Sequence, residues 1–316
     1  MGAVVIASPL RVGRIRIERP PGDDMRVPDH VLKCVGYVAE FLTSDSSGED
    51  YELEGSGFFI GVPCLTIPDL RFHYFATAAH VVRGLDPERT KIIVNHKNGT
   101  RTVITPPEWY FHDDPSVDAA VMPYINRPAF DTMYVGTELF LSSEKMKERM
   151  IGIGDDVFFP GLFQFAPGTK QNHPILRHGN IAMLPETQIQ MDAGFAHVYL
   201  VEARSIGGIS GSPVFTRETV SLETRGADTE KGLIIGIGNK FHLLGMARSH
   251  WDLNERDINS YSGVQDRPRG VNMGIAAVTP AGAILEILNQ AGPALARAEA
   301  ERKHREDISP GFDGVE

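Results

Sequence analysis

Cysteine is scarce in this sequence, with Cys34 and Cys64 the only two among 316 residues. That scarcity excludes the multi-disulfide framework of small secreted domains. Two reduced core thiols are the favoured interpretation, and a single bridge between them is the alternative. The chain also lacks any apolar run as long as a membrane span, and its first residues carry no convincing secretory signal. We therefore expect a cytoplasmic protein that has no membrane partner.

Basic residues are fewer than acidic ones: the chain has 31 Lys and Arg and 41 Asp and Glu, which gives a formal net charge of -10. No basic stripe offsets this balance, so a general nucleic-acid partner is not expected. The sequence contains no His-Glu-x-x-His and no paired-cysteine pattern, and we expect neither a metal nor another cofactor. The 42% apolar and 23% charged residues are ordinary for a globular protein.

Short β-type runs separated by turns fill most of the chain. They follow an N-terminal arm, residues 1–27, that ends in a cluster of proline, glycine and aspartate. Two β-rich halves come next, at about 28–125 and 148–279, and Asn98 with Gly99 is a typical hairpin turn within the first. Many short strands of this kind predict an all-β sandwich or barrel.

Helical signals are concentrated near the C-terminal end. Pro280 stands where proline opens a helix, and Gly292 with Pro293 is expected to end this closing helix, which spans 280–291. Residues 293–316 form a charged tail, rich in alanine, that we expect to be helical and in solvent. The alternative is that the tail binds a partner helix.

A turn of small residues carries the serine best suited to act as a nucleophile. Ser210 lies in the segment GGISGSP, with glycines two positions before it and one position after it. Such a turn can present a hydroxyl while the amides of Gly208 and Ser210 point together, and glycine lets a substrate carbonyl approach without a Cβ in the way. The alternative is an ordinary turn between strands.

Amide hydrolysis by serine also needs a base and a carboxylate that orients the base. His80 follows the apolar run FATAA, whose small residues let an imidazole enter a cleft. Asp118 heads the apolar run DAAVM, so its carboxylate is expected to be partly buried. Asp113 and Asp114 are rivals, but their segment HDDP is typical of an exposed turn. Asp118 is the favoured partner of His80.

Together these segments resemble the motifs of the trypsin-like (chymotrypsin-fold) serine peptidases. FATAAHVV resembles their histidine motif, SVDAAVM their aspartate motif and GGISGSPVF their serine motif, in the chain order of that family. EGSGFFIG and VNMGIAAVTPAGAILEIL resemble the glycine-rich strand before the histidine and the last strand with its closing helix. The resemblance covers residues 31–289, and its style is nearest to bacterial HtrA-like and glutamyl-endopeptidase-like members.

This resemblance implies a serine endopeptidase that acts on protein or peptide substrates through an acyl-enzyme. Its fold would be all-β, with two antiparallel six-stranded β-barrels, a cleft between them and a C-terminal helix, in a domain spanning 28–292. His80 would be the general base and then the acid, and Asp118 would orient it. The amides of Gly208 and Ser210 would form the oxyanion hole.

The resemblance also implies where substrate binds. Arg204 and Ser205 fall near the floor and wall of the primary pocket, where an arginine favours an acidic or polar substrate side chain. The alternative is that Arg204 faces solvent or pairs with a surface acid. The strand near Arg248, Ser249 and His250 would pair with the substrate backbone.

Departures from the family pattern and rival classes complete the sequence-based picture. Ile209 precedes the serine where digestive-type enzymes have an aspartate, so activation by N-terminal cleavage is not expected. An α/β-hydrolase is disfavoured because Ser212 replaces the second glycine of its motif. A catalytically silent or partner-activated module that acts by protein binding is the serious alternative. The long loops 218–233 and 252–270 are candidate lids, candidate docking segments for a regulatory partner, or plain surface loops.

Overall fold

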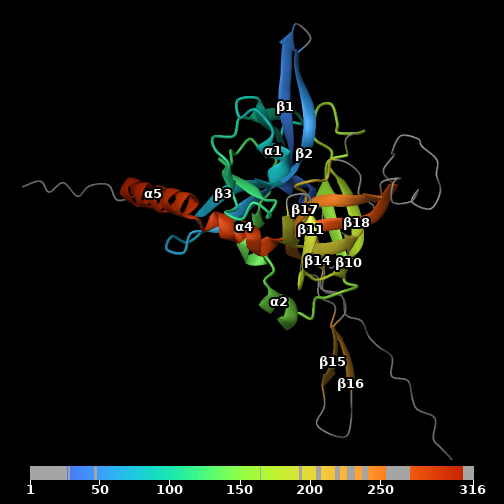
Figure 1. The fold of residues 1–316 in the computed structure, drawn as a ribbon. Helices are drawn as coiled ribbons and strands as arrows, with labels where there is room; N and C mark the ends of the chain where they lie inside the picture. The colour runs from blue at the N-terminus through green and yellow to red at the C-terminus, as the bar shows by residue number, and fades with distance from the viewer. Residues whose placement is uncertain are drawn as a thin grey trace, which may run out of the picture.

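Two β structures, one from each half of the chain, lie beside each other with helix α4 (Ala281–Leu288) packed between them (Figure 1). The structure is a computed structural model that describes residue 27 and residues 29–308, apart from 46–47, 164, 192–193, 204–207, 218–220, 226–231, 237–240 and 254–270.

The N-terminal half is an eight-stranded sheet. Its strands run in the order β5-β4-β1-β2-β3-β7-β6, and β8 pairs with β2 outside this path. The bounds are β1 (Val35–Asp45), β2 (Gly48–Pro63), β3 (Arg71–Thr77), β4 (Thr90–Asn95), β5 (Arg101–Ile104), β6 (Tyr110–Phe111), β7 (Ala120–Pro123) and β8 (Val135–Gly136). The 3-10 helix η1 (Asp29–Cys34) precedes β1, and the short helix α1 (Ala79–Arg83) follows β3.

The C-terminal half contains a closed barrel of six antiparallel strands in the order β10-β13-β18-β17-β14-β9. The bounds are β9 (Asp156–Gly161), β10 (Ile175–Met183), β13 (Tyr199–Glu202), β14 (Pro213–Arg217), β17 (Phe241–Leu253) and β18 (Val271–Pro280). Two hairpins pair β11 (Gln188–Met191) with β12 (Gly194–His197), and β15 (Ser221–Arg225) with β16 (Gly232–Gly236). The segments η2 (Thr137–Leu139) and α2 (Ser143–Glu148) connect the halves.

The predicted all-β class with a C-terminal helix is confirmed, and so is one six-stranded barrel. A second closed barrel is not established, since the described pairs of the N-terminal sheet do not join β5 to β6. The expected turn at Asn98 and Gly99 joins β4 to β5, and Gly99 has a φ of 87° there. This is the left-handed region that glycine adopts without strain.

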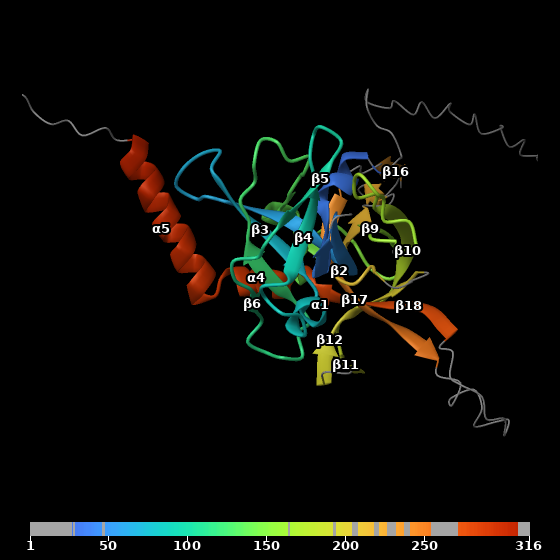
Figure 2. The same ribbon diagram turned by 90° about the horizontal axis from the view of Figure 1, so that it is seen from above.

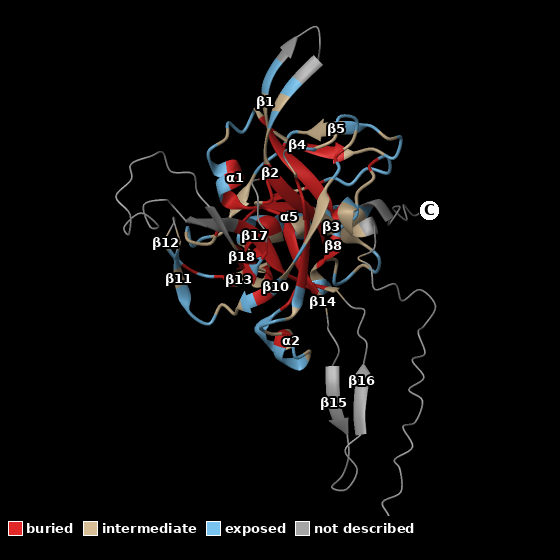
Figure 3. Ribbon diagram, turned by 90° about the vertical axis from the view of Figure 1, so that its right-hand side faces the viewer, coloured by how far each residue is buried: buried red, intermediate tan, exposed pale blue. Residues whose placement is uncertain are grey.

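One hydrophobic cluster spans both halves and fixes them against each other. It contains large aromatic side chains of the N-terminal sheet, including Phe59 and Phe75, together with Met246 of the barrel. Ile284 and Ile287 of α4 belong to the same cluster, so the helix after the last barrel strand packs on the N-terminal sheet. Figure 3 shows the buried residues concentrated where the two halves meet. This packing holds the segments that both halves bring to their junction.

The C-terminal tail is helical, but its helix begins earlier than predicted, after α4 ends at Leu288. The residues Gly292 and Pro293, predicted to end a helix, instead lie in the first turn of α5 (Ala291–Ile308), where proline is tolerated because its missing N–H has no intrahelical acceptor. Helix α5 extends outward beside the N-terminal sheet (Figure 2). Arg297 Nη1 donates to the Leu288 carbonyl at 2.6 Å and to the Tyr74 hydroxyl at 3.1 Å. The base of the tail is therefore anchored on the body of the protein.

Both cysteines are free thiols, as predicted, but only Cys34 lies in the core, whereas Cys64 is partly exposed. Cys34 is buried at the end of η1, and burial raises the pKa of its thiol to about 12. Cys64 Sγ donates to a carboxylate oxygen of Glu301 on α5 at 3.4 Å. Within the described residues, no helix is both long and apolar enough to cross a membrane.

We expect Gly57→Ala to lower the free energy of unfolding by about 1–3 kcal/mol, the usual cost of overpacking. An added Cβ would lie 2.2 Å from the Phe75 ring and 2.6 Å from the Ala76 carbonyl oxygen. Urea unfolding measures the change. Gly282→Ala in α4 is the matched control, because its Cβ meets no atom within 4 Å. Equal losses in the two variants would contradict the packing described here.

Candidate active site

An imidazole and a carboxylate from two neighbouring strands meet at one end of the N-terminal sheet. The register of β3 and β7 places Thr77 opposite Ala120. Because the strands are antiparallel, His80 just after β3 and Asp118 just before β7 come to the same end. Ala78 and Ala79 are fully buried between β3 and His80, so the chain turns tightly into α1. The small residues of the predicted histidine motif thus allow this approach.

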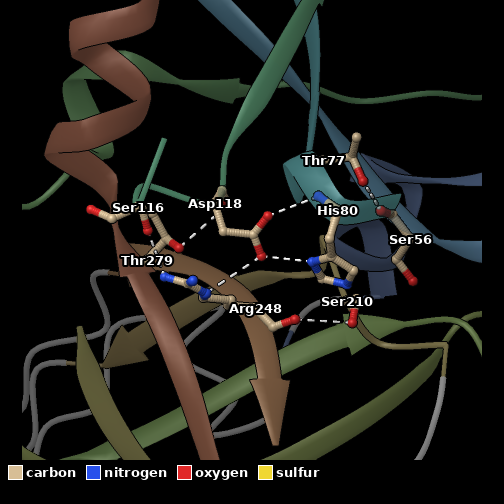
Figure 4. Close-up of polar contacts among 8 residues, drawn as sticks. All are labelled: Ser56, Thr77, His80, Ser116, Asp118, Ser210, Arg248 and Thr279. Atoms are coloured by element: carbon tan, nitrogen blue, oxygen red, sulfur yellow. Dashed lines mark hydrogen bonds and ion pairs between the residues drawn. The ribbon is translucent and has the colours of Figure 1, made fainter. Parts of the chain in front are cut away.

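Both oxygens of the Asp118 carboxylate bind His80. His80 Nδ1 lies 2.6 Å from Oδ2, and the His80 backbone amide donates to Oδ1 at 2.8 Å (Figure 4). The Asp118 side chain is 8% exposed, whereas that of His80 is 49% exposed. The pair therefore has a buried carboxylate at one end and an imidazole open to an incoming molecule at the other.

The charge of Asp118 is stabilised although the residue is buried. Burial by itself would raise the pKa of the carboxyl, but the hydrogen bonds and positive charge of His80, with a smaller contribution from Arg248, outweigh it. The net result is a pKa of Asp118 below its usual value. The group is thus a carboxylate over the range in which an imidazole gains and loses its proton.

The turn that carries Ser210 is built around two glycines in the left-handed region. Gly208 has a φ of 96° and Gly211 a φ of 86°. A Cβ at Gly211 would lie 2.0 Å from the Ser56 carbonyl oxygen, so both conformation and space require glycine there. The Ser210 carbonyl accepts a hydrogen bond from the Ser56 amide at 2.9 Å, and the Gly211 amide donates to Ala247 at 2.7 Å. The turn is therefore hydrogen-bonded to both halves of the chain.

Ser210 and His80 come together around Gly55 of β2. A Cβ at Gly55 would lie 3.0 Å from the Ser210 carbonyl oxygen and 3.0 Å from two methyl groups of Val81, the neighbour of His80. The Ser210 hydroxyl itself donates to the Arg248 carbonyl at 3.0 Å (Figure 4). The structure thus brings the predicted serine, histidine and aspartate to one place.

Arg248, predicted to lie on a strand that pairs with the substrate backbone, has side-chain contacts that the sequence did not predict. Its side chain is buried, with Nε 3.6 Å from Asp118 Oδ2. Its Nη1 donates to the Ser116 carbonyl at 2.9 Å. Sequence reasoning missed these contacts, because no local pattern connects Arg248 with Asp118.

The structure describes only some of the remaining predicted residues. Arg204 and Ser205 lie outside the described residues. The backbones of Ser249 and His250 pair with Ala277 and Ala276 of β18. Ile209 is buried.

The two rival aspartates form contacts away from His80. Asp113 accepts a hydrogen bond from Gln290 at 3.0 Å, and Asp114 accepts one from the Ser116 amide at 2.8 Å. Across the described residues, no cluster of three or more His, Cys, Asp or Glu side chains is arranged to hold a metal ion.

Ser56 is a second residue that sequence reasoning missed, although it lies inside the glycine-rich segment EGSGFFIG. It is fully buried, and its hydroxyl donates to the Gly208 carbonyl and accepts from the Leu162 amide, both at 2.8 Å. The serine between the glycines was the available signal, since a polar residue in a buried strand must find partners.

We expect Ser56→Ala to lower the free energy of unfolding by about 1–3 kcal/mol, because it leaves the Gly208 carbonyl and the Leu162 amide buried without this partner. Urea unfolding measures the loss. Ser143→Ala is the control on an exposed serine, with an expected change within about 0.5 kcal/mol. Indistinguishable unfolding curves for the two variants would refute the bridging role of Ser56.

Known proteins were compared with the sequence and the structure. The sequence matches no protein-family model and no curated protein. Among solved structures, the HtrA-type protease AlgW with a decapeptide aligns at 16% identity and a TM-score of 0.46 over 82% of this chain, which spans 65% of AlgW. The MamO protease domain from Magnetospirillum magneticum aligns at 15% identity and a TM-score of 0.47, over 83% of this chain and 99% of that domain.

The inactive form of the Rv3671c protease aligns at 17% identity and a TM-score of 0.44, over 83% of this chain and 90% of that structure. At TM-scores below 0.5, these likenesses leave the activity of this chain to be judged from its own site. All three structures are described as proteases, and AlgW is described as of the HtrA type.

Proposed function

We propose that this protein is a serine endopeptidase with a catalytic triad of Ser210, His80 and Asp118. The observation that carries the proposal is the buried carboxylate of Asp118, which binds the Nδ1 atom of a half-exposed imidazole at 2.6 Å. That bond selects the tautomer in which Nε2 can accept a proton. The Ser210 turn lies against the same end of the sheet. Base, orienting group and nucleophile are the three parts that acyl transfer needs.

In the proposed reaction, Ser210 Oγ attacks the carbonyl carbon of a peptide bond while His80 Nε2 takes the hydroxyl proton. The carbonyl electron pair moves onto oxygen, where the amides of Gly208 and Ser210 would stabilise the negative charge. Collapse of this intermediate breaks the C–N bond, and His80 gives its proton to the leaving amine. Water then attacks the acyl-enzyme with His80 again as the base, which releases the acid and restores Ser210.

The resting hydroxyl of Ser210 must turn before this reaction can begin. It donates to the Arg248 carbonyl in the structure, and the attack needs it to donate to His80 instead. Catalytic hydrogen bonds commonly tighten only when substrate binds, and we propose that the Ser210 hydroxyl makes this change at that point. The same observation favours a second candidate function, a partner-activated or silent module in which the hydroxyl stays on Arg248.

The peptidase domain is proposed to span residues 28–292, with the N-terminal sheet in the role of the first barrel. Strand β17 pairs with β14 only as far as Met246 but continues along β18 to Leu253, so the backbone near Arg248, Ser249 and His250 is the proposed site of substrate pairing.

Arg204 and Ser205 are proposed to line the primary pocket. We also propose a cytoplasmic location and a regulatory protein partner, since such a peptidase needs restraint.

A fluorophosphonate probe is expected to label the wild-type protein on Ser210. The Oγ–P bond forms, the P–F bond breaks, fluoride leaves and His80 accepts the proton. Ser210→Ala should abolish both labelling and peptide cleavage, as measured by mass spectrometry of the labelled peptide. Full labelling of Ser210→Ala would overturn the assignment.

The matched control is Ser212→Ala, which removes a second hydroxyl from the same turn. Ser212 Oγ is buried without a hydrogen-bond partner among the described residues, so its loss should leave labelling intact. A folded wild-type protein that the probe leaves unlabelled would favour the silent or partner-activated alternative.

Cleavage-site profiling on a denatured proteome is expected to show acidic or polar residues immediately before the cut, because Arg204 would offer a cation in the primary pocket. Arg204→Ala should weaken that preference. The number of cleavage sites that have other side chains immediately before the cut should stay the same. A wild-type profile without any acidic or polar preference would eliminate Arg204 as the pocket residue and leave the triad assignment untouched.

A further inference from the structure

We propose that Arg248 is a positioning residue whose buried charge sets the pH range in which His80 acts as a base. The inference rests on the proposed function and adds a residue to it. Arg248 touches two members of the proposed triad, through its guanidinium on Asp118 and through its backbone carbonyl on Ser210. A single residue thus connects the carboxylate with the nucleophile.

An irregularity in strand β17 directs the Arg248 side chain toward Asp118. Ala247 pairs with Val278 and Ser249 with Ala277, so Arg248 is the extra residue of a β-bulge between them. Bulges change the direction of a side chain and are frequent beside active sites. In a regular strand, the side chain of residue 248 would follow the alternation of its neighbours.

The guanidinium is held where its charge has a large effect. Arg248 is 5% exposed, and its Nη1 donates to the Ser116 carbonyl while Nε faces Asp118 Oδ2. His80 Nδ1 binds the same carboxylate oxygen. Two nitrogen groups therefore share one buried anion, and one of them is permanently charged.

This sharing has a consequence for the reaction. The imidazolium that forms when His80 takes a proton must bind Asp118 in the presence of a second cation, so the protonated form gains less from the carboxylate. Among the described residues, other titratable or charged groups of the elements at this end of the sheet include Arg83 of α1, His112 and Asp114 of the loop before β7, and Glu286 of α4, which binds His112. Thr279 of β18 contributes a hydroxyl to the Asp118 carbonyl oxygen.

Arg248 also borders a cavity of about 300 Å³, whose walls include Val117, Phe195, Thr279 and Ala283. Neither His80 nor Ser210 lines this cavity. We expect a small guanidinium ion in this cavity to take the place of a truncated Arg248 side chain without blocking the proposed nucleophile.

The test follows the rate of fluorophosphonate labelling as a function of pH, which needs no known substrate. Arg248→Gln removes the charge but can still donate to Ser116, and it should move the acidic limb of the profile up by about 1 pH unit. Arg248→Lys keeps a positive charge, so the acidic limb of its pH profile should coincide with that of the wild type, also where its labelling rate is lower. Arg297→Gln, which removes an arginine of α5 that donates to the Leu288 carbonyl of α4, is the matched control with an unchanged profile.

Chemical rescue separates charge from folding. Added methylguanidinium should raise the labelling rate of Arg248→Ala at least several-fold and return its limb toward that of the wild type, without effect on Arg297→Ala. Coinciding acidic limbs for wild type, Arg248→Gln and Arg248→Lys would overturn the inference while the proposed function stands. A wild-type protein that is never labelled overturns the proposed function, and this inference with it.

Discussion

A carboxylate taken out of water must be compensated by hydrogen bonds and positive charge, and the centre of this molecule is arranged around that requirement at Asp118. The group is almost fully buried, yet its pKa lies below the usual value because His80 and Arg248 meet its charge. Two segments far apart in the chain, α1 and the bulge of β17, converge on the side chain of Asp118, which the chain carries just before β7. Their relative position is therefore tied to the charge of Asp118.

The serine turn depends on the same junction between the two halves. Ser56 from β2 fixes the carbonyl of Gly208 through its hydroxyl and that of Ser210 through its amide. On the other side, the Ala247 carbonyl receives the Gly211 amide. A hydroxyl set between an N-terminal strand and a barrel strand keeps its place only while the shared hydrophobic cluster holds the halves together. Packing and proposed chemistry are linked through these bonds.

Much of the fold was predictable, because its signals are local. Short β runs, the turn at Gly99 and the helix start at Pro280 predicted an all-β chain with a helix near its end, and the structure confirms this class. The barrel closure of the N-terminal half was not established, since closure depends on how distant edges meet. The end of the closing helix was misplaced, because proline is a breaker inside a helix but is accepted in its first turn.

The sequence alone determined which residue types stand in which order: a histidine after small residues, an aspartate before an apolar run and a serine between glycines. Those patterns involve residues that are adjacent in the sequence, and adjacent residues largely determine the local backbone conformation. Only the tertiary structure decided that Arg248 turns inward to Asp118 and to Ser116, which is 132 positions away. A β-bulge and a buried ion pair depend on which distant segments pair and pack in the folded chain. No local sequence pattern specifies that pairing.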